Sequence, residues 1–282
     1  MLTASALKQD MEFNKDFGNI VEVLKTSAIM QFRSLQLKQK PNKEFLDELE
    51  LCFNILSDKK INHFYLTERP GMPSLIVIVT SDAGFLGELN TLLVNTAIDE
   101  RKSVQDEIIV LGEQGARYLE DMNLNFTALP GLSEEVDYRQ LQGIRDYLFK
   151  GYKDKFGRVL MVYPEFLSLT TQKIKVLQFL PCKLPVLQKN KASVIMENAI
   201  LGPNEIKLLE RLIEIWSGFN ILDIAWSSKQ SEYAARIMHL EGSSQELAHI
   251  NERVAFDYFR LVHTLRDKSI REISAAKLLL EK

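Results

Sequence analysis

The last quarter of the chain most constrains what it can fold into. From Ser231 to Lys282 the sequence has one glycine, no proline and no apolar run of membrane length. Its apolar residues recur at steps of three and four, which keeps them on one side of an α-helix: Ile237, Leu240, Leu247, Ile250, Val254, Tyr258, Leu261 and Leu265. A helix cannot bury such a stripe alone. The sequence therefore predicts a long helix that pairs with another helix or enters a surrounding partner.

The beginning of the chain supplies a second stretch of the same kind. Apolar residues recur at helical spacing from Ser5 to Ser57, with a break or kink expected at Pro41. Antiparallel pairing of the two terminal helices would cover both stripes, as in a coiled coil. We expect the N-terminal coiled-coil helix over residues 1–68 and the C-terminal one over residues 203–282. The latter is expected to be interrupted at Ser217–Asn220, where a glycine and weak helix formers occur.

The middle of the chain, residues 69–202, has a different pattern. The turn-rich segment RPGMPS at Arg69–Ser74 precedes five apolar segments, several of them rich in β-branched residues, which predict strands: SLIVIVTSD, DEIIVLG, NFTALP, RVLMVYPEF and KIKVLQFLP. Helical segments separate the first strands, and Ser133 is expected to cap one of them. Such alternation is typical of a parallel sheet with helices on both faces. The fold class is thus α/β, a doubly wound, Rossmann-like domain between the coiled-coil helices; residues 183–202 have no clear assignment.

Charge and cysteine content exclude several classes of protein. A net charge of −3 argues against nucleic acid as the main partner, because phosphate binding needs a basic surface. Two cysteines, Cys52 and Cys182, provide neither a disulfide framework nor a metal-ligand cluster. The first residues lack the apolar core of a signal peptide. We expect an intracellular chain that can dock on a membrane complex.

One turn lies where doubly wound domains bind ligands. The segment TSDAGFLGELN at Thr80–Asn90 leads from a predicted buried strand into a helix, and backbone N–H groups at a helix start can hold an anion. The dinucleotide fingerprint G-x-G-x-x-G is absent, however, and so is the phosphate-loop pattern ending in G-K-[ST]. We interpret the segment as a structural strand-to-helix turn and predict no cofactor site.

No other residue pattern predicts an active site or a metal site. The four histidines, His63, His239, His249 and His263, have no neighbour at metal-ligand spacing, and the G-x-S-x-G nucleophile motif is missing. Arg236 lies among small apolar residues in a predicted helix. It is either solvated on the polar face or bound to a carboxylate of the partner helix or of another subunit.

Three segments together resemble the γ subunit of the rotary F-type ATP synthase. The first helix is similar to the AMKMVAASKLRRAQ-like core of that family at Leu24, Lys25, Ala28, Arg33 and Gln36. The turn resembles the SDRGLCGGLN segment at Ser81, Asp82, Gly84, Gly87, Leu89 and Asn90. SEYAARIM resembles the SE-x-x-ARM-x-AM segment at Ser231, Glu232, Ala235, Arg236 and Met238. The three occur in the family's order and separation.

This resemblance implies a non-catalytic rotor. In the family the two terminal helices form an antiparallel coiled coil that enters a ring of alternating α and β subunits. The foot of the shaft stands on the membrane ring of c subunits beside the ε subunit, and its rotation couples proton or sodium flow to ATP synthesis or hydrolysis. The implied contacts with the catalytic ring are Leu24, Lys25, Arg236, Tyr258, Val262 and His263. The implied location is peripheral, on the cytoplasmic face of the cell membrane.

The chain departs from the family pattern at several of these places. The family has an Arg-Gln pair where this chain has Val262 and His263, and an Ile-Thr pair where it has Arg266 and Asp267. The methionine of the first helix is Leu24 here. In the turn, the family's arginine and cysteine are Ala83 and Leu86. The chain thus resembles a divergent γ subunit, and LGEQGARYLEDMN is similar to the alternative, often sodium-linked branch.

Two other functions stay open on the sequence alone. A γ-like chain can serve a related motor that only hydrolyses ATP. From a different class, an α/β ligand-binding or enzymatic domain can carry helical dimerisation arms. Nucleotide titration separates this last function from the first, because a central stalk has no tight nucleotide site of its own.

Overall fold

The computed structural model describes residues 3–38, 49, 52–53, 63–134, 137–182 and 205–280. These residues divide into two compact units: Gln31–Arg236, and Met1–Met30 together with Ile237–Lys282. The predicted segments 183–202 and most of 39–62 lie outside the described residues.

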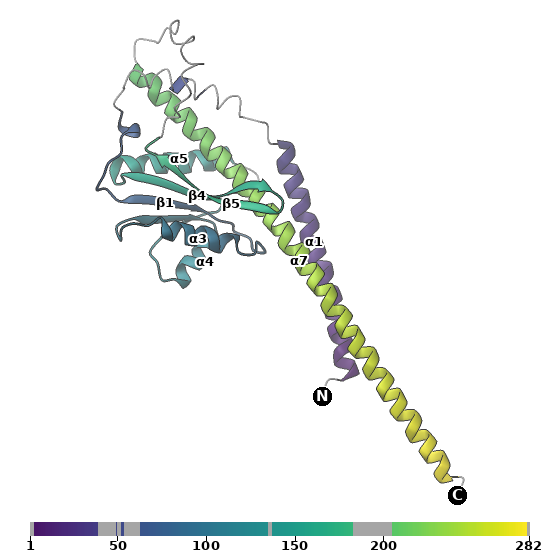
Figure 1. Ribbon diagram of the computed structural model, residues 1–282. Coiled ribbons are helices and arrows are strands. Elements are labelled where there is room, and N and C mark those ends of the chain that lie inside the picture. Colours follow the sequence, from purple (N-terminus) through teal and green to yellow (C-terminus); the bar gives the residue numbers. More distant parts are fainter. Residues whose placement is uncertain are drawn as a thin grey trace. The chain divides into compact units, whose positions relative to one another are not determined.

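The unit Gln31–Arg236 contains one five-stranded sheet in the order β3-β2-β1-β4-β5 (Figure 1). The strands are β1 (Ser74–Val79), β2 (Glu107–Leu111), β3 (Thr127–Leu129), β4 (Arg158–Ser168) and β5 (Thr171–Leu180). β1 runs parallel to β2 and to β4, and β3 runs parallel to β2. β5 pairs with β4 as an antiparallel hairpin, so the last predicted strand is an antiparallel edge on an otherwise parallel sheet.

Helices cover both faces of this sheet, as the alternation of strands and helices predicts. On one face, Ile76 and Ile78 pack with α3 (Leu89–Asp99) and α4 (Glu113–Asp121). On the other, Leu75 and Val77 pack with α5 (Tyr138–Asp154) and the first part of α7 (Glu205–Leu280) (Figure 1). All six side chains of β1 are buried because both faces are covered. The short 3-10 helix η1 (Phe64–Leu66) precedes β1.

Two details of the helices differ from the sequence-based expectation. α7 is continuous from Glu205 to Leu280, although an interruption was expected at Ser217–Asn220. The Ser217 hydroxyl donates to the carbonyl of Glu214, and the Asn220 amide donates to the carbonyl of Trp216, so both polar side chains bond within the helix. The residue that caps α5 is Asp137, which accepts a hydrogen bond from the Arg139 N–H, whereas Ser133 lies before it and bonds to Gln140.

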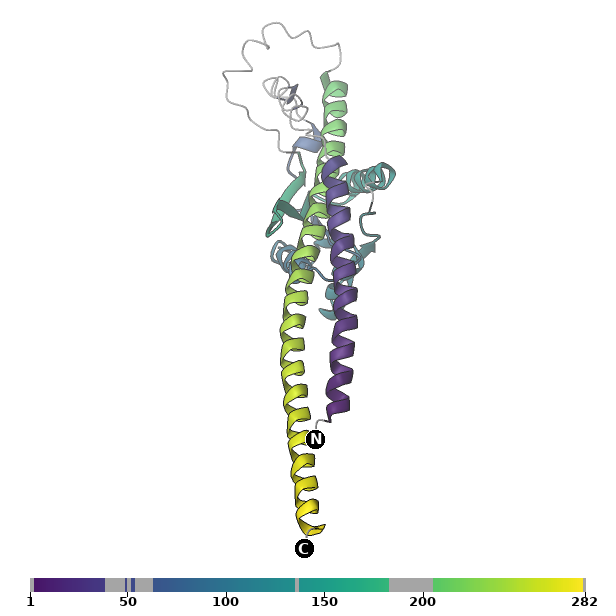
Figure 2. The same cartoon turned by 90° about the vertical axis from the view of Figure 1, so that its right-hand side faces the viewer.

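The second unit consists of two helices. Residues of α1 (Ala4–Lys38) lie beside the C-terminal part of α7 (Figure 2). Lys25 contacts Glu241, and Gly18 lies against Leu247, so the contacts advance along one helix as they recede along the other. A Cβ added at Gly18 would stand 3.3 Å from Leu247 Cδ2, which shows how closely the helices approach there. This confirms the predicted fold class, an antiparallel helix pair with a doubly wound α/β domain.

Among the described residues, no helix combines the length and apolarity needed to cross a membrane. The predicted division into residues 1–68, 69–202 and 203–282 remains a prediction, since the two compact units are defined by packing and each combines pieces of several segments.

Candidate functional site

The turn Thr80–Asn90 is closed by its own side chains. The Ser81 N–H donates to Asn90 Oδ1 over 3.3 Å, and Asn90 Nδ2 donates to the Ser81 hydroxyl over 3.0 Å. Both residues are buried. Gly87 has φ +58°, a left-handed conformation that glycine adopts without strain. Gly84 has open space around its Cα, so packing does not require a glycine there.

Asp82 ties this turn to the next helix. Its Oδ1 accepts a hydrogen bond from the Glu113 N–H, the first amide of α4, over 3.0 Å. A carboxylate at a helix N-terminus satisfies a free amide and complements the helix dipole. Gly131 packs so closely on Asp82 that an added Cβ would stand 2.4 Å from Oδ2. Asp82 thus serves as a helix cap supplied by a different segment.

The ligand-binding place of a doubly wound sheet is filled by the chain itself. The strand order reverses between β1 and β4, and ligands of such folds bind outside the carboxyl ends of these strands. Here the residues at that place are Thr80, Pro164, Ser228, Lys229 and Glu232, the last three from α7, and the space among them is about 10 Å³. Small-molecule sites typically have about 300–1,000 Å³. The turn is therefore packed against α7 and does not open onto a nucleotide-sized cleft.

Arg236 is bound inside the chain. Its Nη2 lies 2.8 Å from Glu232 Oε1, and its Nε donates to the Gly84 carbonyl over 3.3 Å. The side chain is 12% exposed. Neither interpretation of this arginine describes what the structure shows: the side chain is not solvated, and the carboxylate that it binds lies on its own helix rather than on the partner helix.

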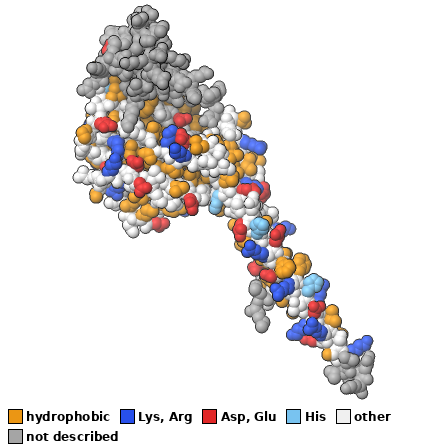
Figure 3. All heavy atoms as spheres, in the orientation of Figure 1, with side chains coloured by type: hydrophobic (Ala, Val, Ile, Leu, Met, Phe, Trp, Pro, Cys, Tyr) orange, Lys and Arg blue, Asp and Glu red, His pale blue; other side chains and the backbone are white. Residues whose placement is uncertain are grey.

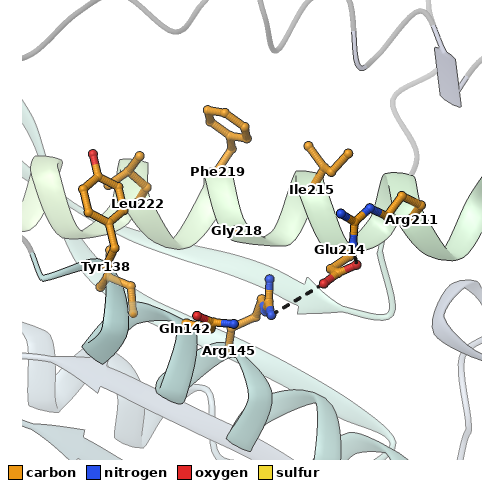
Figure 4. Close-up of a pocket in the computed structure, with 10 residues that line it drawn as sticks. Tyr138, Gln142, Arg145, Arg211, Glu214, Ile215, Gly218, Phe219 and Leu222 are labelled. Atoms are coloured by element: carbon orange, nitrogen blue, oxygen red, sulfur yellow. Dashed lines mark hydrogen bonds and ion pairs between the residues drawn. The ribbon is translucent and has the colours of Figure 1, made fainter.

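Another groove, of about 430 Å³, lies between α5 and α7 (Figure 4). Tyr138, Gln142 and Arg145 of α5 line one side, and Glu214 and Gly218 of α7 line the other. Arg145 lies 3.8 Å from Glu214, the one acid among the lining residues, which also pairs with Arg211. Ile215 and Phe219 point away from α5 in Figure 4. The groove offers apolar surface and two arginines, both paired with its one acid, and the described part of the chain has no cluster of potential metal ligands.

In the helix pair, Lys25 is bound on two sides. Its Nζ lies 2.7 Å from Glu22 Oε2 on its own helix and 3.0 Å from Glu241 Oε2 on α7. Hydrogen bonds to Glu22 and then to Glu241 raise the pKa of Lys25 above its usual value. The hydrogen bond from Lys25 lowers the pKa of Glu241. The neighbouring Leu24 is 37% exposed, so of these two predicted contact residues Leu24 is the accessible one.

The predicted contacts near the end of α7 are accessible to different degrees. Tyr258 and Val262 are half-buried and His263 is exposed. Every described side chain from His263 to Lys277 is exposed, including the apolar Leu265, Ile270 and Ile273. Figure 3 shows acidic and basic groups interspersed along this part of the molecule. The end of α7 thus presents a mixed surface that no described residue of the chain covers.

Comparison with known proteins identifies the family. The family model described as ATP synthase matches residues 3–272, nearly the whole chain. The chain belongs to the ATP synthase γ-chain family. Curated relatives include the ATP synthase gamma chain of Clostridium botulinum (strain Kyoto / Type A2), 24% identical, with 92% of this chain and 93% of that one aligned. The gamma chain of Cytophaga hutchinsonii is 26% identical over 90% of each chain.

Solved structures show the same fold. A chain of the Euglena gracilis mitochondrial ATP synthase, OSCP/F1/c-ring, in rotational state 3 matches with a TM-score of 0.73 at 17% identity, covering 98% of this chain and 94% of that one. A chain of the rotor of the same synthase matches with a TM-score of 0.68 at 15% identity, covering 93% and 98%. These likenesses extend across the helix pair and the α/β domain.

Sequence reasoning missed one feature of this γ-family chain. Lys229 and Glu232 form a buried ion pair of 2.9 Å that continues to Arg236. The signal was the run Ser227–Glu232, six polar residues in succession within an otherwise apolar helical segment. A run of this kind is usually interpreted as solvated, whereas five of these six residues are buried.

Proposed function

We propose that this chain is the central-stalk rotor subunit of an F-type ATP synthase or ATPase. In this role it couples ion movement through a membrane ring to ATP synthesis or hydrolysis on a catalytic ring. The observation that carries the proposal is the family match over residues 3–272, in a chain whose two ends form an antiparallel helix pair. The Clostridium botulinum γ chain aligns with it over 93% of that chain's length.

The helix pair explains how a rotor of this type acts without making or breaking covalent bonds itself. Different side chains face outward around its circumference, so each equivalent subunit of a surrounding ring meets a different surface at any one angle. A surface of the helix pair can shift a ring subunit from one conformation to another only if it binds the two conformations with different affinities. Rotation would therefore pass the ring subunits through their nucleotide states in order. The filled switch point of the sheet supports a non-catalytic role for the α/β domain.

The partners in this proposal are the α and β subunits of the catalytic ring, the ε subunit and the c-subunit membrane ring. The chain would then lie peripherally on the cytoplasmic face of the membrane, bound through the c ring. The relatives and structural neighbours support this proposal, because they are ATP synthase chains, one of them in an assembly described as OSCP/F1/c-ring. The coupling ion, proton or sodium, is left open by the proposal.

The proposed contacts with the ring divide by accessibility. Leu24, Tyr258, Val262 and His263 present at least part of their side chains, and they are proposed to touch the ring directly. Lys25 and Arg236 are occupied by Glu241 and Glu232, and they are proposed to support the contact surface from inside the chain.

Co-expression with the α and β subunits of the same organism tests the proposal. We expect one copy of the chain to co-purify with an α–β ring and a bead attached to the α/β domain to rotate during ATP hydrolysis. Isothermal titration of the isolated chain with ATP and ADP should show no tight binding. If the chain does not co-purify with the ring and binds a nucleotide tightly, the alternative function applies: an α/β ligand-binding or enzymatic domain with helical dimerisation arms.

A further inference from the structure

The part of α7 that crosses the carboxyl edge of the sheet has an unusual environment. Residues 228–235 are all buried, eight consecutive positions on a helix. Five of them, Ser228 to Glu232, are polar or charged. Burial of charged groups costs several kcal/mol for each ion, unless partners compensate it. A sequence that places lysine, glutamate and arginine here therefore needs a specific arrangement to hold them.

That arrangement is a chain of ionic contacts. Glu232 lies between two cations: Oε2 is 2.9 Å from Lys229 Nζ, and Oε1 is 2.8 Å from Arg236 Nη2. The exposed fractions of the three side chains are only 7%, 10% and 12% for Lys229, Glu232 and Arg236. One anion thus serves two cations. The excess positive charge faces the carbonyl of Gly84, to which Arg236 Nε donates over 3.3 Å.

The surroundings of these three residues are largely shielded from solvent. Burial, followed by the charge of Glu232, raises the pKa of Tyr233 to about 12. The Arg236 guanidinium lies over the Tyr233 ring, 5.7 Å from its centre. In such surroundings charge-charge interactions are stronger than at a solvated surface, and an unpaired charge is costly.

The ion pairs themselves lie within α7, whereas hydrogen bonds link this part of the helix to two different parts of the domain. Through Gly84, Arg236 holds the turn that follows β1. On another side of the helix, the hydroxyl of Ser231 donates to the carbonyl of Pro164 over 3.1 Å, and the Phe166 N–H donates to the hydroxyl of Ser227 over 3.0 Å, both in β4. The helix is therefore fastened at the point where the strand order reverses, the place that a ligand occupies in other doubly wound proteins.

We propose that the ion pairs of Lys229, Glu232 and Arg236 hold the Arg236 side chain against the Gly84 carbonyl and so form an ionic latch between α7 and the carboxyl edge of the sheet, and that force passes between the helix and the α/β domain through this latch. The second part rests on the proposed rotor function. The latch residues are positioning residues: their side chains are almost fully buried and act by keeping the helix and the domain in one orientation. A rotor needs such a connection because a helix that turns within its own domain would lose torque.

Because Glu232 is paired with both cations, its variants and those of Lys229 should loosen the latch to different extents. Glu232→Gln leaves two buried cations without a counter-charge, so it should loosen the latch most. Lys229→Met leaves Glu232 paired with Arg236, so its effect should be smaller, and Lys229→Arg keeps the charge and should resemble the wild type. Glu113→Gln removes an exposed pair with Arg117 at the same helical spacing and serves as the matched control.

Amide hydrogen exchange of the full chain measures the latch directly. We expect exchange at residues 81–90 and 228–236 to rise by about 100-fold in Glu232→Gln and about tenfold in Lys229→Met. The rise should stay below about twofold in Lys229→Arg and Glu113→Gln. Unchanged exchange in Glu232→Gln, or equal effects of all four variants, would overturn the latch.

The assembled motor measures the transmission of force. In membrane vesicles, Lys229→Met should lower the ratio of ions pumped to ATP hydrolysed, while Lys229→Arg and Glu113→Gln leave it unchanged. If Lys229→Met exchanges faster but pumps as many ions per ATP as the wild type, the force-bearing role is overturned. The latch would then only stabilise the fold. A wild-type chain that never assembles with a ring would overturn the proposed function and the force-bearing role together, while the exchange data would still decide the latch.

Discussion

At the scale of single residues, the carboxyl edge of the sheet depends on glycines that permit close approach. Gly112 has φ +109°, and a Cβ there would stand 2.6 Å from the Thr80 carbonyl oxygen. Thr80 in turn donates its hydroxyl to the carbonyl of Leu111 over 2.8 Å, which draws the end of β1 onto the end of β2. The backbone conformation and the available space therefore both require glycine at this position.

Gly112→Ala should lower the free energy of unfolding by about 2–4 kcal/mol, because it combines a left-handed backbone with a steric clash. Gly143→Ala is the matched control. Gly143 lies inside α5 with open space around its Cα, so alanine there should raise stability by up to about 1 kcal/mol. Urea denaturation followed by circular dichroism measures both. Equal effects of the two substitutions would contradict this account of Gly112.

Asp106 makes the stability of the sheet depend on pH. Burial alone would raise the pKa of Asp106, but hydrogen bonds from the N–H groups of Ser74, Ser103 and Lys102, with the charge of Arg158, lower it below its usual value. The Ser74 N–H lies 2.7 Å from Oδ1. A carboxylate with a depressed pKa in the folded state stabilises the fold above its unfolded pKa, and this contribution is lost as pH falls through the folded value.

Asp106→Asn should therefore cost about 1.5–3 kcal/mol of stability at pH 7, the usual loss of a hydrogen bond to a charged group. The difference between variant and wild type should shrink as the pH falls below about 4, where the carboxyl of the unfolded chain becomes protonated. It should be lost at a still lower pH, where the carboxyl of the folded chain is protonated as well. Urea titrations at several pH values measure it. The exposed Asp10→Asn variant is the control, and a difference that is constant with pH would contradict the assignment.

The sequence predicted the importance of some of these residues, but not the contacts that they make. The family resemblance drew attention to Ser81, Asp82 and Asn90. The sequence also offered a structural interpretation of their turn, but not the contact between Asp82 and α4, because nothing local indicates that two segments meet. The polar run at 227–232 was visible in the sequence, yet its burial depends on tertiary packing that no local periodicity encodes.

At the scale of elements, the apolar periodicity of the long helix predicted its extent better than its residues of low helix propensity did. Ser217, Gly218 and Asn220 suggested an interruption, since each has a low helix propensity. Packing of α7 on the sheet overrides that preference: Ile213, Ile221 and Ile224 are buried in the main core on both sides of the expected break. The sequence likewise predicted β5 as a strand but not its antiparallel pairing with β4, because Leu169 and Thr170, the two residues between the strands, are not one of the usual hairpin dipeptides.

Lys25 and Glu241 form an ion pair between the two helices, and we expect this pair to help fix their register. Lys25→Met and Glu241→Gln should each lower the melting temperature, and the double variant should lose less than the sum, because the second change removes a partner that is already gone. High salt should reduce the coupling. Lys268 and Glu272, an exposed pair 3.9 Å apart on the same helix, should show no measurable coupling in the matching cycle. Additive effects at Lys25 and Glu241 would show that the helices are held in register by other contacts.

At the scale of the whole molecule, function and stability are expected to reside in different parts of the chain. The sheet and its helices lie within Gln31–Arg236, whereas the described side chains from His263 to Lys277 are exposed. Residues that bury little surface contribute little to folding. An exposed stretch that carries apolar side chains such as Ile270 and Ile273 is consistent with a segment that a partner covers in the assembled state.

A chain that ends at Asp257 tests whether function and stability reside in different parts of the molecule. It should keep the circular dichroism and the unfolding midpoint of the α/β domain, because no residue of that unit is removed, but ATP-driven ion pumping should fall much more than ATP hydrolysis. A chain cut after Ala276 is the control and should pump nearly normally, since it keeps Tyr258, Val262 and His263. Pumping is measured in vesicles that contain the complete synthase, with the midpoint measured on the isolated chain. If the shorter chain pumps ions as the wild type does, the end of α7 is not part of the shaft that the ring grips, and the proposed contacts must lie nearer Leu24.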